Sequence, residues 1–177
     1  MISIKVEQTE RLQNLFENTP KEIPKIISRA LNRSATFART ASARKVRQTY
    51  RVKHAQVIGS IKIKKAYPGD LVAELRSEDS PIPLTGFQAS KNRKGYRVSV
   101  KRGTGKQINH AFLLTPSKFG DSNISIRKTA NRTPTQGLFG PSIPQMIGNE
   151  NIIDGVVDEA TEMLGKRMEH EISRLLT

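Results

Sequence analysis

The sequence predicts an α+β fold, with a long N-terminal helix and a C-terminal helix packed on a small antiparallel β-sheet or partial barrel. Near both ends of the chain, apolar residues recur every three or four positions, as they do on one face of a helix. In the middle, apolar and polar residues alternate with a period of two, which is typical of strands. The length fits a single domain spanning residues 1–177.

The N-terminal part of the chain begins with a short predicted strand and a short predicted helix. Residues 2–6 alternate apolar and polar side chains, whereas residues 7–17 carry apolar side chains at helical spacing. A long amphipathic helix follows over residues 21–50, with Thr19 as its N-cap and Pro20 at its first position. Proline is tolerated there because the first N–H groups of a helix have no intrahelical partner.

The long helix has two contrasting faces. Its apolar seam contains small residues such as Ala30, Ala38 and Ala41, which let another element approach closely. Apart from Glu22 the helix carries no acid, whereas solvated helix faces normally mix both signs of charge. We therefore expect this basic helical region, residues 19–59, to face a polyanion such as DNA or an acidic partner. The candidate contacts are Arg29, Arg33, Arg39, Arg44, Lys45, Arg47, Arg51 and Lys53.

Residues 60–128 are predicted to form antiparallel strands. The segments 61–64 and 71–76 alternate apolar and polar side chains on either side of a Tyr-Pro-Gly-Asp turn, which favours a β-hairpin. The segment 96–100 alternates in the same way and has one apolar and one basic face. Two more strands are expected at 111–114, as a short buried strand, and at 124–127.

The segment 129–148 is rich in proline and glycine, which exclude regular structure over most of its length. Two interpretations stay open, an extended arm that engages a neighbouring subunit or a loop that caps the core of the same domain. The apolar anchors of an inter-subunit arm would be Leu138, Phe139, Ile143 and Met146. The final predicted helix, residues 149–177, differs from the first because its exposed face mixes both signs of charge.

Composition excludes several classes of protein. There is no cysteine, which rules out disulfides, cysteine-ligated metal sites and thiol nucleophiles. The N-terminal sequence MISIKVEQTE has no apolar segment, so we expect no signal peptide, and no run has the length of a membrane span. The formal net charge of +14 favours a polyanionic partner, and nucleic acid contacted through its backbone is the first candidate.

The sequence offers no recognisable catalytic or metal-binding pattern. His54, His110 and His170 stand in no metal-ligand spacing with one another or with acids. The run around Gly103 and Gly105 lacks the spacing of a phosphate-binding loop, so a β-turn explains it better. We therefore expect a protein that is not an enzyme and that needs no metal ion and no cofactor.

Two segments carry a resemblance to a known family. Residues 30–35 read Ala-Leu-Asn-Arg-Ser-Ala at the start of an Ala-, Ser- and Arg-rich helix, and residues 140–144 read Gly-Pro-Ser-Ile-Pro. Together with the order of strands between them and the closing helix, they make the chain resemble the prophage minor tail protein Z family, the tail completion proteins of long-tailed bacteriophages.

The resemblance implies a structural virion protein at the head-proximal end of the tail, near the neck. Such a protein would help complete the tail, join it to the head and hold the leading end of the genome. Its expected partners are other tail and neck proteins, copies of itself in a homo-hexameric ring, and genomic DNA. It would be found in the virion, and in the host cytoplasm during assembly. The family has no known catalytic residues, so the resemblance implies none in this chain.

Two other hypotheses remain. The first is a freestanding, sequence-nonspecific nucleic-acid-binding protein, which would bind DNA or RNA with a steep salt dependence but would not associate with tail proteins. The second is a nuclease-like packaging factor, which would cleave DNA in a metal-dependent way through Asp or Glu residues.

Overall fold

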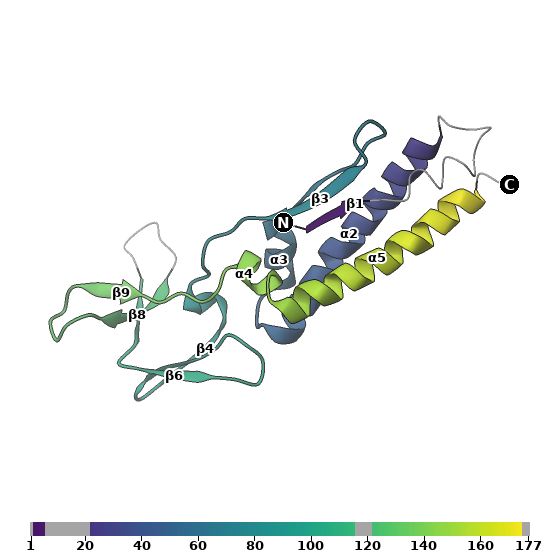
Figure 1. Ribbon diagram of the computed structural model, residues 1–177. Coiled ribbons are helices and arrows are strands. Elements are labelled where there is room, and N and C mark those ends of the chain that lie inside the picture. Colours follow the sequence, from purple (N-terminus) through teal and green to yellow (C-terminus); the bar gives the residue numbers. More distant parts are fainter. Residues whose placement is uncertain (1, 6–21, 116–121, 175–177) are drawn as a thin grey trace.

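The computed structural model describes residues 2–5, 22–115 and 122–174 (Figure 1). The helices are α2 (Ile23–Thr49), α3 (His54–Ser60), the 3-10 turn η1 (Leu84–Gly86), α4 (Ile143–Ile147) and α5 (Glu150–Ser173). The strands are β1 (Ile2–Lys5), β2 (Ile61–Lys64), β3 (Val72–Ser77), β4 (Gln88–Asn92), β5 (Gly95–Ser99), β6 (Lys106–Asn109), β7 (Phe112–Leu114), β8 (Asn123–Arg127) and β9 (Thr135–Gly137). The predicted α+β class is confirmed. The predicted helix over 7–17 and the Thr19 cap lie outside the described residues.

The two long helices α2 and α5 lie side by side and run antiparallel (Figure 1). A buried polar link joins them, in which the hydroxyl of Ser34 donates to the carbonyl oxygen of Ala160 at 2.7 Å. Ala30 and Ala38 are fully buried and Ala41 is 1% exposed, so the small-residue seam predicted for the long helix is confirmed as a packing surface. Small side chains leave room for the neighbouring backbone, which explains how one side-chain hydroxyl spans the interface.

The strands form three separate antiparallel sheets of three strands each, in the orders β1-β3-β2, β4-β5-β6 and β7-β8-β9. The predicted hairpin is confirmed as the β2–β3 pair, in which Ile63 lies opposite Leu75. Ala73 and Leu75 are buried beneath this sheet, which packs on α2. The sheets do not close into a barrel in the described part of the chain.

Six strands, β4 to β9, form a lobe that projects away from the two long helices (Figure 1). We call this part the β-lobe. It is attached to the helical part by backbone hydrogen bonds from Arg51 to the carbonyl oxygen of Val100 at 2.9 Å and from Arg102 to that of Thr49 at 2.8 Å. The turn after β5 is therefore held against the C-terminal end of α2.

One local prediction needs correction. The segment 111–114 is a strand only from Phe112, and it is not buried, because Leu113 is 46% and Leu114 is 42% exposed. Strand β7 pairs only with β8 among the described strands, so its outer edge has no covering neighbour there. A short apolar run cannot distinguish a central strand from such an edge strand.

The segment 129–148 is irregular over most of its length, as predicted, and its regular parts are the short strand β9 and the helix α4. Ser142 caps α4 through a capping box, in which its hydroxyl accepts from the Gln145 N–H while the Gln145 side chain accepts from the Ser142 N–H. This Ser-x-x-Gln pattern satisfies two N–H groups that a helix start leaves without partners.

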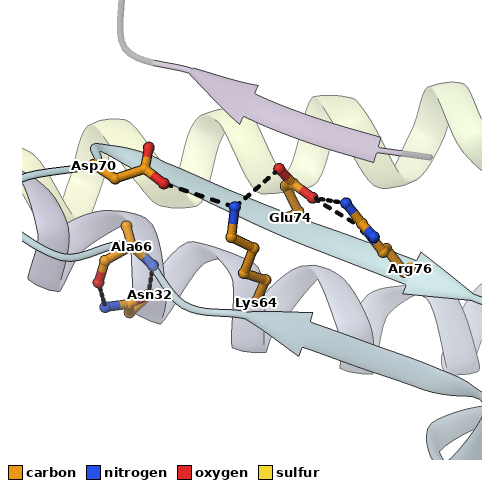
Figure 2. A network of polar contacts seen from close by, with 6 residues as sticks. All are labelled: Asn32, Lys64, Ala66, Asp70, Glu74 and Arg76. Carbon is orange, nitrogen blue, oxygen red and sulfur yellow. Dashed lines mark hydrogen bonds and ion pairs between the residues drawn. The ribbon is translucent and has the colours of Figure 1, made fainter.

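Two hydrogen bonds between the Asn32 side chain and the Ala66 backbone hold the segment after β2 against helix α2 (Figure 2). The Asn32 side chain donates to the Ala66 carbonyl oxygen and accepts from the Ala66 N–H, both at 2.8 Å. Ala66 is 5% exposed, so its N–H and carbonyl groups have little access to water. The amide of Asn32 thus replaces the neighbouring strand that the Ala66 backbone lacks.

Replacing Asn32 with alanine is expected to lower the free energy of unfolding by about 2 kcal/mol, because both Ala66 backbone groups lose their partners. Chemical denaturation of the full chain measures this loss. Gln48→Ala, an exposed change on the same helix, serves as the control and should cost less than about 0.5 kcal/mol. Equal stability of Asn32→Ala and wild type would show that the two hydrogen bonds between Asn32 and Ala66 do not stabilise the folded state.

A network of ion pairs lies on the β2–β3 hairpin (Figure 2). Glu74 accepts from Arg76 at 2.8 and 3.1 Å, and Lys64 lies 3.5 Å from Glu74 and 3.7 Å from Asp70. The hydrogen bond from Arg76, with a smaller contribution from the charge of Lys64, lowers the pKa of Glu74. These acids pair with Lys64 of β2 and Arg76 of β3, so this side of the molecule mixes both signs of charge.

Candidate nucleic-acid interface

Three of the eight candidate cations on the basic helical region have a carboxylate partner on α5. Arg44 and Lys45 both contact Glu159, Lys45 at 3.1 Å, and Arg29 lies 3.8 Å from Glu171. The long helix therefore has more counter-charge than its own sequence suggests, since spacing within one helix does not reveal ion pairs between helices. These three side chains are less available to a polyanion than the sequence predicted.

The other five candidate cations have no acid within ion-pair distance among the described residues. Arg33, Arg47 and Lys53 are exposed. Arg39 and Arg51 are half-buried, and the Nε atom of each is buried without a hydrogen-bond partner in the described part of the chain. The uncompensated positive charge of the helical region therefore concentrates on these five residues.

The turn after β5 adds a further arginine at the C-terminal end of α2. Arg102 donates from its Nε to the carbonyl oxygen of Arg47 at 2.7 Å, which satisfies one of the free carbonyls at the helix end. The remaining N–H groups of its guanidinium stay available, because a guanidinium has five donors in all. We call Arg47, Lys53 and Arg102 the α2-end cluster.

A shallow groove beside the α2-end cluster contains no acid in its lining. It is lined by Thr40, Arg44, Arg47, Gln48, His54 and Arg102. An adjacent depression is lined by Arg51, by Arg97 of strand β5 and by the turn at 103–105. The Lys101 ammonium lies 5.6 Å from the ring centre of Tyr50, within the range of a cation–π contact. The end of α2 and the start of the β-lobe thus share one cationic surface.

The β-lobe carries much more positive charge than the candidate contacts predicted from the sequence. Residues 81–148 contain eleven Lys and Arg residues and a single acid, Asp121. Those with exposed side chains in the structure are Lys91, Arg93, Lys94, Arg97, Lys101, Arg102, Lys106, Arg127, Lys128 and Arg132. The scarcity of acids and the basic face of residues 96–100 are readable in the sequence, but the candidate contacts were taken only from the helical region.

The four predicted anchors of an inter-subunit arm have different environments. Ile143 and Met146 are fully buried in the core of this chain, and Leu138 packs against that core while half-buried. Phe139 is 58% exposed, although its backbone bridges to Pro83. Within one chain, the segment therefore contributes to the core through three residues and leaves one aromatic side chain on the surface.

The described residues contain no group of three or more His, Asp or Glu side chains arranged to hold a metal ion. None of the described helices combines the length and the apolar character that crossing a bilayer requires.

Comparison with known proteins gives one match. A family described as prophage minor tail protein Z matches residues 8–177 of this chain. Among curated proteins no match is found, and none is found among solved structures.

Proposed function

The chain belongs to the prophage minor tail protein Z family and is a structural protein of the bacteriophage tail, and from this premise we propose that it acts as a tail completion subunit at the head-proximal end of the tail. In this role it helps join the tail to the head and hold the leading end of the genome. The observation that carries the proposal beyond the family is the α2-end cluster, Arg47, Lys53 and Arg102, which has no ion-pair partner among the described residues.

Positive charge that attracts phosphates suits a protein through which a genome must pass. Contacts to phosphates attract DNA and fix its position but read no sequence, so the duplex is held at any register. The Arg102 guanidinium donates to the Arg47 carbonyl oxygen, and both side chains line one groove at the end of the 27-residue helix α2. A rigid support keeps the charges in place while the DNA moves.

We propose that several copies assemble as a ring, with six as the number expected from the family resemblance. Each chain has a formal net charge of +14, so copies in a ring repel one another until a polyanion fills the opening. The exposed Phe139 is the one predicted arm residue free to contact a neighbouring subunit or another tail protein. The other partners in this proposal are proteins of the tail and neck.

The test is to produce particles without this protein and to examine them by negative-stain electron microscopy and infectivity assay. The proposal expects full heads and tails that are not joined, and an infectivity that wild-type protein restores when supplied in trans. Normal, infectious particles would contradict it. Normal particles combined with strong DNA binding by the purified protein would instead favour a freestanding nucleic-acid-binding protein.

A further inference from the structure

An open groove in the β-lobe is lined by cations and by no acid. It has a volume of about 710 Å³ and lies where the turn between β4 and β5 faces strand β8. The residues that line it are Lys91, Asn92, Arg93, Lys94, Gly95, Asn109, His110, Ala111, Phe112, Ile126, Arg127, Thr129 and Ala130. We call it the β-lobe groove.

The turn on one wall of the β-lobe groove is held in a fixed conformation. The Asn92 side chain accepts from the Lys94 N–H at 3.0 Å, and the His110 N–H donates to the Lys94 carbonyl oxygen at 2.8 Å. Gly95 has φ +139°, and a side chain there would collide with the carbonyl oxygen of Ile108. Since this backbone is fixed before any ligand binds, its cations lose less entropy on binding.

The opposite wall carries an arginine that is also held in place. The guanidinium of Arg127 lies 5.8 Å from the ring centre of Phe112, within the range of a cation–π contact. Neither Arg127 nor Lys94 has an acid within ion-pair distance among the described residues. Both walls of the β-lobe groove therefore present positive charge that nothing in the described chain neutralises.

Strand β5 connects the β-lobe groove to the α2-end cluster. Its first residue, Gly95, lines the groove, while Val100, just beyond its end, accepts from the Arg51 N–H at the end of α2. Five residues of strand span about 17 Å. Over that length, duplex DNA carries about ten phosphate charges. Arg97, midway along β5, is exposed and lies in the depression between the two sites.

We infer that the β-lobe groove binds the phosphodiester backbone of duplex DNA and that, with the α2-end cluster, it forms one contact surface along β5. This inference rests on the proposed function and extends its DNA contact from the helix to the β-lobe. An acidic protein segment is the less favoured occupant, because Phe112 and Ile126 are the only large apolar side chains in the lining and Phe112 already contacts Arg127.

The test compares two double variants of the purified full chain by fluorescence anisotropy with a labelled duplex, over a series of salt concentrations. Lys94→Gln with Arg127→Gln removes one cation from each wall of the groove. Lys62→Gln with Lys65→Gln removes the same charge from exposed positions outside it and serves as the matched control. The groove variant should lose affinity by roughly 10- to 100-fold at about 100 mM salt, and its salt slope should fall by about 2. The control variant should keep both values close to wild type.

Each other outcome overturns the inference. Equal losses in both variants would mean that net charge, and not the groove, determines binding. Unchanged DNA binding in the groove variant, with binding by wild type intact, would exclude the groove while leaving the proposed tail function standing. A groove variant that loses binding to poly-glutamate but not to DNA would identify an acidic protein segment as the occupant. Circular dichroism confirms in each case that the variants are folded.

Discussion

Replacing Arg47 and Lys53 with glutamate is expected to lower the affinity of the full chain for duplex DNA by at least about 100-fold near 100 mM salt. Each phosphate contact that is lost costs roughly tenfold under these conditions, and each introduced carboxylate adds repulsion. Neither side chain makes a hydrogen bond or an ion pair with another described residue, and both are exposed. The change should therefore act on binding more than on folding.

The measurement is a salt titration of DNA binding, with a thermal melt of each variant in parallel. A glutamate at position 47 stands in the last turn of α2, where the helix dipole disfavours it by about 0.3–1 kcal/mol, so a small loss of stability is expected. Lys62→Glu with Lys65→Glu gives the same change of charge on β2 and the residue after it, and should bind DNA much more tightly than the first variant. If the two double variants bind equally, the α2-end cluster has no special role.

Replacing Leu31 with alanine is expected to have the largest effect on folding, a loss of about 3–5 kcal/mol in the free energy of unfolding. Leu31 is fully buried among the residues of α2 and its neighbours, and the small side chains around it cannot fill the cavity. For a chain of this size, such a loss lowers the melting temperature by about 10 °C. Differential scanning calorimetry measures both quantities.

The matched control for this change is Leu113→Ala, because Leu113 is 46% exposed and its removal leaves no enclosed cavity. It should cost less than about 1 kcal/mol. A small effect of Leu31→Ala, comparable with that of Leu113→Ala, would contradict the placement of Leu31 in the core and, with it, the packing of the helical layer.

The sequence predicted the long elements best. Helix α2 lies within two residues of its predicted ends at 21 and 50, because its apolar period persists over seven turns and Tyr50 leaves the helical conformation at its end. The β2–β3 hairpin was predicted correctly because a clear turn separates two alternating segments. In these elements the local pattern and the tertiary environment favour the same structure.

Other elements had no readable pattern. Strands β4 and β6 are exposed over most of their length, so their side chains are polar on both faces and show no period of two. The helix α4 was missed because Pro144 within it and Gly140, Pro141 and Gly148 around it suggested a loop, although the capping pair Ser142 and Gln145 was a signal for it. Edge strands and short capped helices depend on neighbours that a linear pattern does not reveal.

The candidate interface was predicted in part. The five unpaired cations on the helical region, including Arg33 and Lys53, were expected from the absence of acids in that segment. The ion pair between Arg29 and Glu171 was not expected, because 142 positions separate the two residues in the chain and only the packing of α5 on α2 brings them together. For the same reason, nothing in the linear order placed Arg102 beside Arg47.

Protein–DNA cross-linking on intact, DNA-filled particles, followed by mass spectrometry, tests most directly whether this cationic surface faces the genome. The account predicts nucleotide adducts on peptides that contain Arg47 and Lys53, and on peptides from the β-lobe groove that contain Lys94. Particles in which other virion proteins carry adducts, while these peptides carry none, would contradict it.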